Sequence, residues 1–239
     1  MNDVDGKIEK FLADLDRVWP GAYAAVLFGS AARGEYLPGW SDINILLIAD
    51  QLTPASLRIA REALADWRES AEAVPLLFSA TEWRRSADAY PLEIAEMRTG
   101  YRLLRGADPL VGMTVRPADL RAALEREFRG KLMRLRQGYA VFPPGSDDLT
   151  EFARSSASSV LLLCRALLIL QGDSVPAAAE AVIARAGERA GFAPQAVQRV
   201  VAGRADAGWR CSEEDVQGYL AAVESAAGFV DHFQIGART

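Results

Sequence analysis

The chain has 239 residues, of which 50% are apolar and 25% charged, a mixture typical of a folded globular protein and not of a disordered or fibrous one. Its 27 basic and 32 acidic side chains give a net charge of −5, which argues against general binding to duplex nucleic acid, because that binding depends on neutralising phosphates. The single histidine, His232, and the widely separated Cys164 and Cys211 are too few for a zinc site or a histidine-based catalytic triad. We therefore expect any chemistry to rely on carboxylates, hydroxyls, backbone amides or a bound cation.

Neither the beginning of the chain nor its most apolar stretch predicts a membrane segment. The first residues include acids every few positions and no apolar run of the kind found in signal peptides. The stretch 160–170 is short and is interrupted by Arg165, so we do not expect it to cross a bilayer. We expect a cytoplasmic protein whose two cysteines are free core thiols.

Apolar periodicity predicts both helices and strands in the first half of the chain. The spacing over 4–19 indicates a helix, and the short apolar runs 23–28 and 43–49 indicate buried strands. Thr53 and Pro54 are typical of a helix start, and we expect that helix to reach about residue 70. Further elements are predicted as a strand at 74–78, a short helix capped by a serine at 79 and a strand at 101–104.

The second half is predicted to be entirely helical. Expected helices are 117–141, 146–171, 176–190, 194–203 and 212–233. We therefore predict two domains, an α/β (α+β) domain at 1–116 and an all-α helical bundle at 117–239. Residues 121–136 hold six basic side chains against two acidic ones; we interpret them as a solvated helix face, with binding of a triphosphate or second substrate by Lys131 and Arg134 as the alternative.

Residues 26–48, VLFGSAARGEYLPGWSDINILLI, combine a phosphate-binding pattern with a cation-binding one. Gly29 lets the backbone approach a ligand, and Ser30 with the following amides offers donors to an anion at what we expect to be a helix start. Arg33 is placed for a bidentate phosphate contact. Asp42 and Asn44 are two positions apart, so they point to the same face of the second strand. A phosphate cradle facing a carboxylate favours Mg²⁺ bridging the two.

This segment resembles the nucleotidyltransferase superfamily of the DNA polymerase β type, in which a Gly-Ser turn after one strand is followed by two carboxylates on the next. The matching residues are Gly29, Ser30, Arg33, Gly34, Ser41 and Asp42. The resemblance implies a mixed sheet, and small bacterial members of the superfamily pair this domain with a helical C-terminal one. It also implies that Asp42 and Asn44 are catalytic and hold metal, and that Gly29, Ser30, Arg33 and Ser41 bind the nucleotide.

The sequence departs from the family pattern in its carboxylates. Asn44 occupies the position of the second family carboxylate, which removes one negative charge from the expected metal site. The family uses a third carboxylate on a later strand, whereas the predicted strand 74–78 contains no acid. Glu93 and Glu96 are the nearby candidates, and neither aligns with the motif.

Two functions follow from this comparison. The first is an enzyme that uses Mg²⁺ to transfer a nucleoside monophosphate from a nucleoside triphosphate to a hydroxyl group of a small molecule, such as an aminoglycoside, or of a protein. The second is a degenerate nucleotidyltransferase fold that binds nucleotide or a partner protein with little catalysis. We expect neither duplex nucleic acid nor a membrane as partner, and a homodimer is among the assemblies left open.

Overall fold

The structure, a computed structural model, describes residues 2–19, 21–70 and 73–236. It divides into two compact units, one ending at Thr114 and the other beginning at Val115. A boundary at 116 between independently folding domains stays a prediction.

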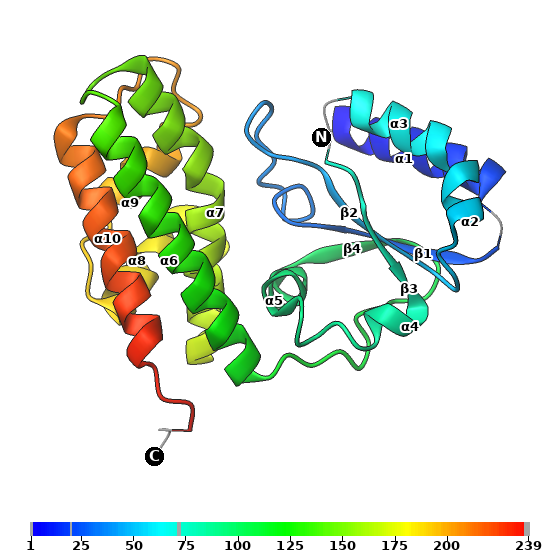
Figure 1. The fold of residues 1–239 in the computed structure, drawn as a ribbon. Coiled ribbons are helices and arrows are strands. Elements are labelled where there is room, and N and C mark those ends of the chain that lie inside the picture. The colour runs from blue at the N-terminus through cyan, green and yellow to red at the C-terminus, as the bar shows by residue number, and fades with distance from the viewer. Residues whose placement is uncertain (1, 20, 71–72, 237–239) are drawn as a thin grey trace. The chain divides into compact units, whose positions relative to one another are not determined.

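The first unit is built on a mixed sheet of four strands in its described part (Figure 1). Its elements are α1 (Asn2–Val18), β1 (Tyr23–Phe28), β2 (Asn44–Ala49), α2 (Pro54–Ile59), α3 (Arg61–Glu69), β3 (Leu76–Ser79), α4 (Ala80–Trp83), α5 (Pro91–Thr99) and β4 (Tyr101–Arg105). The strand order is β3-β2-β1-β4, in which β1 is antiparallel to β2 and β4, and β2 is parallel to β3.

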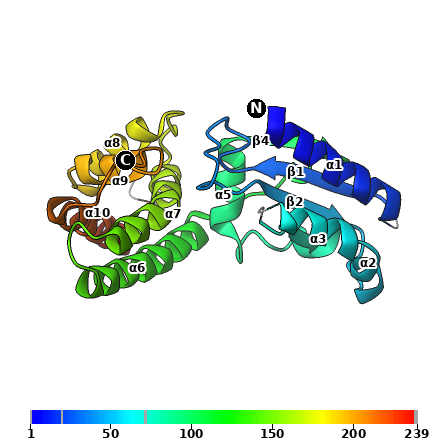
Figure 2. The ribbon, with the colours of Figure 1, turned by 90° about the horizontal axis from the view of Figure 1, so that it is seen from above.

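One face of the sheet packs under α1 and α3, which lie side by side in both views (Figures 1 and 2). Alternate residues of the central strands and one stripe of α1 form the core of this layer. Its buried members are Ile8, Phe11, Leu12, Leu15, Ala25, Leu27, Ile43, Ile45, Leu47, Ala60, Ala63 and Trp67. Because side chains alternate along a strand, the residues between these core positions on β1 and β2 point to the opposite face.

The opposite face is covered by α4 and α5, and α5 was not predicted from the sequence. Phe78 of β3 contacts Trp83 and Tyr90 edge to face. The helix α5 begins at Pro91 and buries four of the next six residues, namely Leu92, Ile94, Ala95 and Met97. The apolar side chains of this short helix therefore lie on several of its sides. It lacks the single apolar stripe by which an amphipathic helix is recognised in a sequence.

Two other predicted elements differ from the structure. The helix expected from Pro54 to about residue 70 is divided at Ala60 into α2 and α3. The third strand begins at Leu76 and not at Val74, whose side chain is 53% exposed. Both differences concern element ends, which local propensity defines poorly.

The described part of the second unit contains five helices and no strand. They are α6 (Pro117–Val141), α7 (Asp147–Gln171), α8 (Ala179–Ala190), α9 (Gln195–Ala202) and α10 (Glu213–His232). Ser146 and Ser212 cap α7 and α10, each accepting a hydrogen bond of 3.1 Å from the amide three residues on. A mixed sheet with helices followed by a helical unit confirms the predicted fold class.

The central helix of the second unit, α7, is longer than the apolar stretch recognised in the sequence. By length and composition alone it is apolar enough to cross a membrane, which corrects the expectation that the segment is too short and too charged. However, 67% of its most apolar window is buried inside the structure, as in the core helix of a globular protein. Cys164 and Cys211 are buried free thiols, as predicted.

Candidate functional site

The chain leaves β1 through a tight turn at Gly29 and Ser30. Gly29 has a φ of +76°, a conformation that favours glycine. The amide of Arg33 donates to Gly29 O at 3.3 Å, and the amide of Glu35 donates to Ser30 O at 2.8 Å. Residues 30–34 form consecutive turns and no helix, so the helix start expected at this point is wrong.

The first amides of this turn differ from the later ones in their hydrogen bonding. Within the described ranges, no hydrogen bond is found from the backbone N–H groups of Ser30, Ala31 or Ala32. The turn is held by the amides of Arg33 and Glu35. The three consecutive donors before them are therefore available to a ligand. Successive N–H groups of this kind form a concave site suited to an anion such as a phosphate group.

Asn44 lies against this turn, at the start of β2. It pairs with Phe28 across the β1–β2 ladder, so the neighbouring Gly29 is adjacent to it. A Cβ atom built on Gly29 would stand 2.9 Å from Asn44 Nδ2 and 3.7 Å from Asn44 Cγ. The side chain of Asn44 therefore occupies the space beside the Gly29 α-carbon, and the two residues, 15 positions apart in sequence, meet in the fold.

Asp42 lies two positions before Asn44 in the chain. The residue between them, Ile43, is fully buried in the core beneath α1. Asp42 and Ile43 precede β2, and if the chain is extended here, alternation would direct Asp42 and Asn44 to the face opposite that core; a shared face stays a prediction. Asp42 is exposed, and no hydrogen bond or ion pair is found for its carboxylate among the residues described.

Ser41 closes the loop that leads into β2. Its Oγ accepts a hydrogen bond of 3.1 Å from the amide of Leu37, and its own amide donates to Leu37 O at 2.9 Å. These bonds give Ser41 a local structural role. Nucleotide binding by Ser41 stays a prediction.

Arg33 is held by two carboxylates. Its Nε donates to Glu35 Oε2 at 3.2 Å, and its Nη1 donates to Glu96 Oε1 at 3.4 Å. The side chain also packs against Gly100, where an added Cβ would stand 3.0 Å from Arg33 Cγ. In this structure the guanidinium group therefore faces acids, and a phosphate contact by Arg33 stays a prediction.

The second and third carboxylates of the family pattern have no clear equivalent. The parallel register pairs Leu46 of β2 with Leu76 of β3. The four residues of β3 that pair with β2, Leu76 to Ser79, include no acid. In the part of the chain described, no group of three acidic, histidine or cysteine side chains is arranged to hold a metal ion.

The donor set fits one divalent cation better than two. Mg²⁺ is commonly bound through one or two protein carboxylates together with the phosphates of its nucleotide. Asp42 offers a carboxylate and Asn44 an amide oxygen, which suits a cation that arrives with a triphosphate. A pair of cations would require more anionic oxygens than these two residues supply.

Glu35, Glu96 and Gly100 are site residues that sequence reasoning did not assign. Glu35 lies two positions from Arg33, so a local charge pair was readable from the sequence. The sequence offered Glu96 as a helix acid or as a candidate third carboxylate, and the structure shows that it binds Arg33 across 63 positions. No local pattern signals such a contact.

Three of the six basic side chains at 121–136 on α6, Arg121, Arg129 and Arg136, form ion pairs within the described part of the second unit. Arg121 donates to the carbonyl oxygens of Asp231 and Phe233, and Arg129 forms an ion pair with Asp231 at 2.9 Å. Lys131 is half-buried, and burial lowers its pKa, as does the nearby Arg134. Anion binding by Lys131 and Arg134 stays a prediction.

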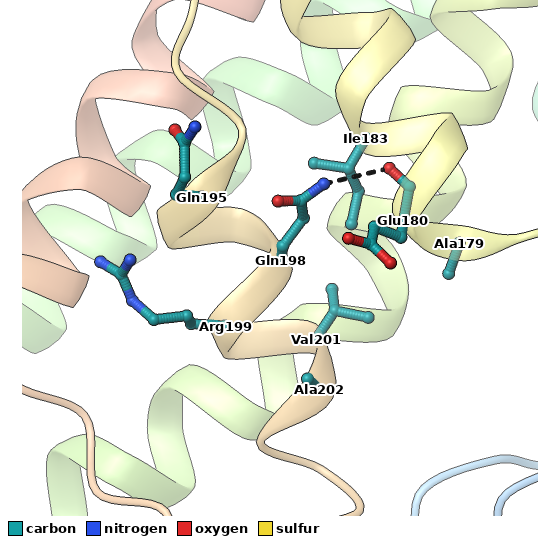
Figure 3. Close-up of a pocket in the computed structure, with 8 residues that line it drawn as sticks. All are labelled: Ala179, Glu180, Ile183, Gln195, Gln198, Arg199, Val201 and Ala202. Carbon is teal, nitrogen blue, oxygen red and sulfur yellow. Dashed lines mark hydrogen bonds between the residues drawn. The ribbon is translucent and has the colours of Figure 1, made fainter.

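The second unit also contains a mostly apolar cavity of about 500 Å³ between α8 and α9 (Figure 3). Gln198 crosses it and donates to the carbonyl oxygen of Glu180 at 3.2 Å. Ile183 and Val201 form apolar walls. None of the predicted site residues lines this cavity, so it is separate from the Gly29–Asn44 region.

Comparison with known proteins gives one family match. Residues 8–81 match the family described as nucleotidyltransferase domain, a range that includes α1, β1, β2 and the loop carrying Gly29 and Asp42. No curated protein matches the chain. The matched range is the part of the first unit in which the Gly-Ser turn meets the start of β2, so this part of the chain is similar to a nucleotidyltransferase domain.

Proposed function

We propose that this chain binds a nucleoside triphosphate with Mg²⁺ at the loop 29–44 and transfers the nucleoside monophosphate to a hydroxyl group of a small molecule or a protein. The observation that carries the proposal is the meeting of Gly29 with Asn44 at the end of two antiparallel strands, inside the range that matches the nucleotidyltransferase domain. This arrangement supports a phosphate site and a cation site at one edge of the sheet.

In this proposal the turn after β1 binds the β- and γ-phosphates. The backbone amides of Ser30, Ala31 and Ala32 donate to phosphate oxygens, and the Ser30 hydroxyl adds a further donor. Such contacts require little rearrangement, because the turn is already held by the Glu35 amide. Positioning of the triphosphate by a preformed turn is the main contribution that these residues make.

Asp42 and Asn44 would hold the cation. A bound Mg²⁺ supplies positive charge that offsets the charge of the triphosphate. Asp42 provides the anionic oxygen and Asn44 the amide oxygen of this site. During transfer, the acceptor oxygen bonds to the α-phosphorus while the bond to the bridging oxygen breaks, pyrophosphate leaves and the hydroxyl proton passes to water.

A second candidate function is nucleotide or partner binding with little transfer. Two observations favour it, the amide of Asn44 at a carboxylate position and the lack of a three-acid group in the described ranges. Fewer anionic ligands would weaken charge compensation at the reacting phosphate. The two functions share the binding site and differ in whether pyrophosphate is released.

The experiment that separates them uses ATP labelled at the α-phosphate or at the γ-phosphate. The full chain is incubated with each nucleotide and Mg²⁺, and label on the protein and pyrophosphate in solution are both measured, with the protein's own hydroxyls as acceptor. Nucleotidyl transfer attaches only the α-label and releases pyrophosphate. The incubation is repeated with an added hydroxyl acceptor such as an aminoglycoside, and ATP binding seen by calorimetry without either product in both cases supports the second candidate.

Asp42→Asn is the matched variant, and Asp50→Asn is its control. Asp50 follows β2 at its far end and is also exposed. The proposed site is supported if Asp42→Asn loses nucleotide binding and transfer while Asp50→Asn keeps both. Equal behaviour of both variants, or no binding of ATP by the unmodified chain, overturns the proposal.

A further inference from the structure

Two carboxylates compete for the one basic residue of the loop to which we assign the triphosphate. Glu35 and Glu96 each accept a hydrogen bond from Arg33, at 3.2 and 3.4 Å. The guanidinium group of Arg33 therefore lies between two carboxylates. This is an unusual setting for a residue whose proposed partner is a polyphosphate, because like charges close together repel.

The cluster is largely shielded from water. The side chains of Arg33 and Glu96 are 13% and 12% exposed, and that of Glu35 is 27% exposed. Ion pairs at this level of burial are screened less than pairs on the open surface. Gly100 packs against the stem of Arg33 and limits where it moves. The Arg33–Glu96 contact is therefore a defined part of the folded unit.

Phosphate binding by Arg33 requires the same atoms that the acids occupy. A guanidinium group binds phosphate through pairs of N–H groups along its edges. Here Nε and Nη1 already donate to carboxylates. A phosphate that approaches Arg33 must therefore replace at least one of them. Glu35 lies in the same turn as Arg33, whereas Glu96 belongs to α5, so Glu96 is the partner from which the turn separates when Arg33 moves.

We propose that Glu96 is a specificity-determining residue that competes with the β- and γ-phosphates of a nucleotide for Arg33. A nucleoside triphosphate displaces Glu96 because it brings phosphates to the turn at 29–34. A nucleoside monophosphate lacks those phosphates and leaves the Arg33–Glu96 pair intact. The contact therefore weakens triphosphate binding relative to a neutral residue at 96 and leaves monophosphate binding unchanged, so Glu96 sets how strongly the loop prefers triphosphates over monophosphates. This inference rests on the proposed function of the loop.

The test is calorimetric measurement of ATP and AMP affinity, each with Mg²⁺, for the full chain and for Glu96→Gln. Glutamine keeps the shape and the acceptor oxygen but removes the charge. We expect ATP to bind about five- to tenfold more tightly to the variant, the range for loss of a partly buried charge-assisted hydrogen bond. AMP affinity stays unchanged. Asp88→Asn, which removes an exposed charge from the same unit, leaves both affinities unchanged.

Arg33→Gln and the double variant Arg33→Gln, Glu96→Gln complete a cycle. If Glu96 acts through Arg33, its replacement has no effect on ATP affinity once Arg33 is absent. Thermal unfolding confirms that each variant is folded. Should Glu96→Gln not fold, Glu96→Asp shortens the side chain and draws the carboxylate away from Arg33, so it too should tighten ATP binding and leave AMP binding unchanged.

The outcomes separate this inference from the function on which it depends. If the unmodified chain binds ATP and Glu96→Gln does not tighten that binding, the inference is wrong and the proposed function stands. The inference is also wrong if Glu96→Gln tightens AMP binding, or if it still tightens ATP binding when Arg33 is replaced. Competition for Arg33 predicts neither result. If no form of the chain binds ATP, the proposed function fails and the inference with it.

Discussion

The amide side chain of Asn44 fills the space that a side chain on Gly29 would need. This contact connects the turn after β1 with the start of β2, where Phe28 and Asn44 are paired. Gly29 is thus required for two independent reasons, its positive φ and its contact with Asn44. The turn proposed to bind phosphate and the residue proposed to hold the cation therefore form one structural unit.

Replacing Gly29 with alanine should cost more stability than its backbone conformation alone explains. The positive φ costs a non-glycine residue roughly 1 kcal/mol, and displacing Asn44 adds a comparable amount, so we expect a loss of about 2 kcal/mol. Gly34→Ala is the control, since Gly34 has the same φ of +76° and no atom within 4 Å of an added Cβ. Urea unfolding measures both. Equal losses would show that Asn44 moves aside without cost.

Changing Asn44 to aspartate should make nucleotide binding more dependent on Mg²⁺. The new carboxylate gives the cation a second anionic ligand next to Asp42, so we expect tighter ATP binding with Mg²⁺ and faster pyrophosphate release. Without the cation, the added negative charge should weaken ATP binding. Calorimetry of ATP binding with and without Mg²⁺ tests both the expected gain in affinity with the cation and the expected loss without it. A variant with the same Mg²⁺ dependence as the unmodified chain would place Asn44 outside the cation site.

Local sequence signals predicted the elements that carry this site. The apolar runs of β1 and β2 and the serine caps of α7 and α10 are formed as expected, because each depends on periodicity or on a hydrogen bond within three residues. The spacing of Gly29, Asp42 and Asn44 indicated a common site. Their roles in nucleotide and metal binding stay predictions.

Features that depend on tertiary contacts were not predictable in this way. The helix α5 has no one-sided apolar stripe, since it is buried on several sides by the rest of its unit. The pairing of Arg33 with Glu96 joins residues 63 positions apart and follows from where α5 packs. The turn at 30–34 was expected to be helical, but its backbone hydrogen bonds, to the carbonyl oxygens of Gly29, Ser30 and Ala31, do not continue as a helix.

Replacing either of two glycines in α6 with alanine should change stability, but in opposite directions at the two positions. A Cβ on Gly138 would stand 2.2 Å from Cε1 of Phe152 on α7, so Gly138→Ala must displace this ring or the helices and should cost about 2 kcal/mol. On Gly130 the nearest atom to an added Cβ is Arg134 Nη2, at 3.9 Å. Gly130→Ala should therefore stabilise the helix by roughly 0.5–1 kcal/mol. Thermal unfolding of the two variants measures this contrast, and a shift of the same sign in both would contradict it.

The N-terminus of α10 should make stability depend on acidic pH. Burial by itself raises the pKa of Asp215, but hydrogen bonds from Arg199 and Ser212 outweigh it and hold that pKa below its ordinary value. A carboxyl whose pKa is lower in the folded state stabilises the fold above its unfolded pKa of about 3.9, and this stabilisation is lost as pH falls through the folded value. Urea unfolding between pH 7 and pH 3 should therefore show a steeper acid loss for the unmodified chain than for Asp215→Asn.

Glu224 provides the comparison for this pH effect. It forms an ion pair with Arg136 at 2.6 Å, but both side chains are mostly exposed, at 62% and 57%. Exposed pairs contribute little to stability, so Glu224→Gln should change the unfolding free energy by less than about 0.5 kcal/mol at any pH in the range. The difference in unfolding free energy between the unmodified chain and Asp215→Asn should be largest near pH 7 and shrink below pH 4. A difference that stays constant with pH would mean that Asp215 acts through packing and not through its charge.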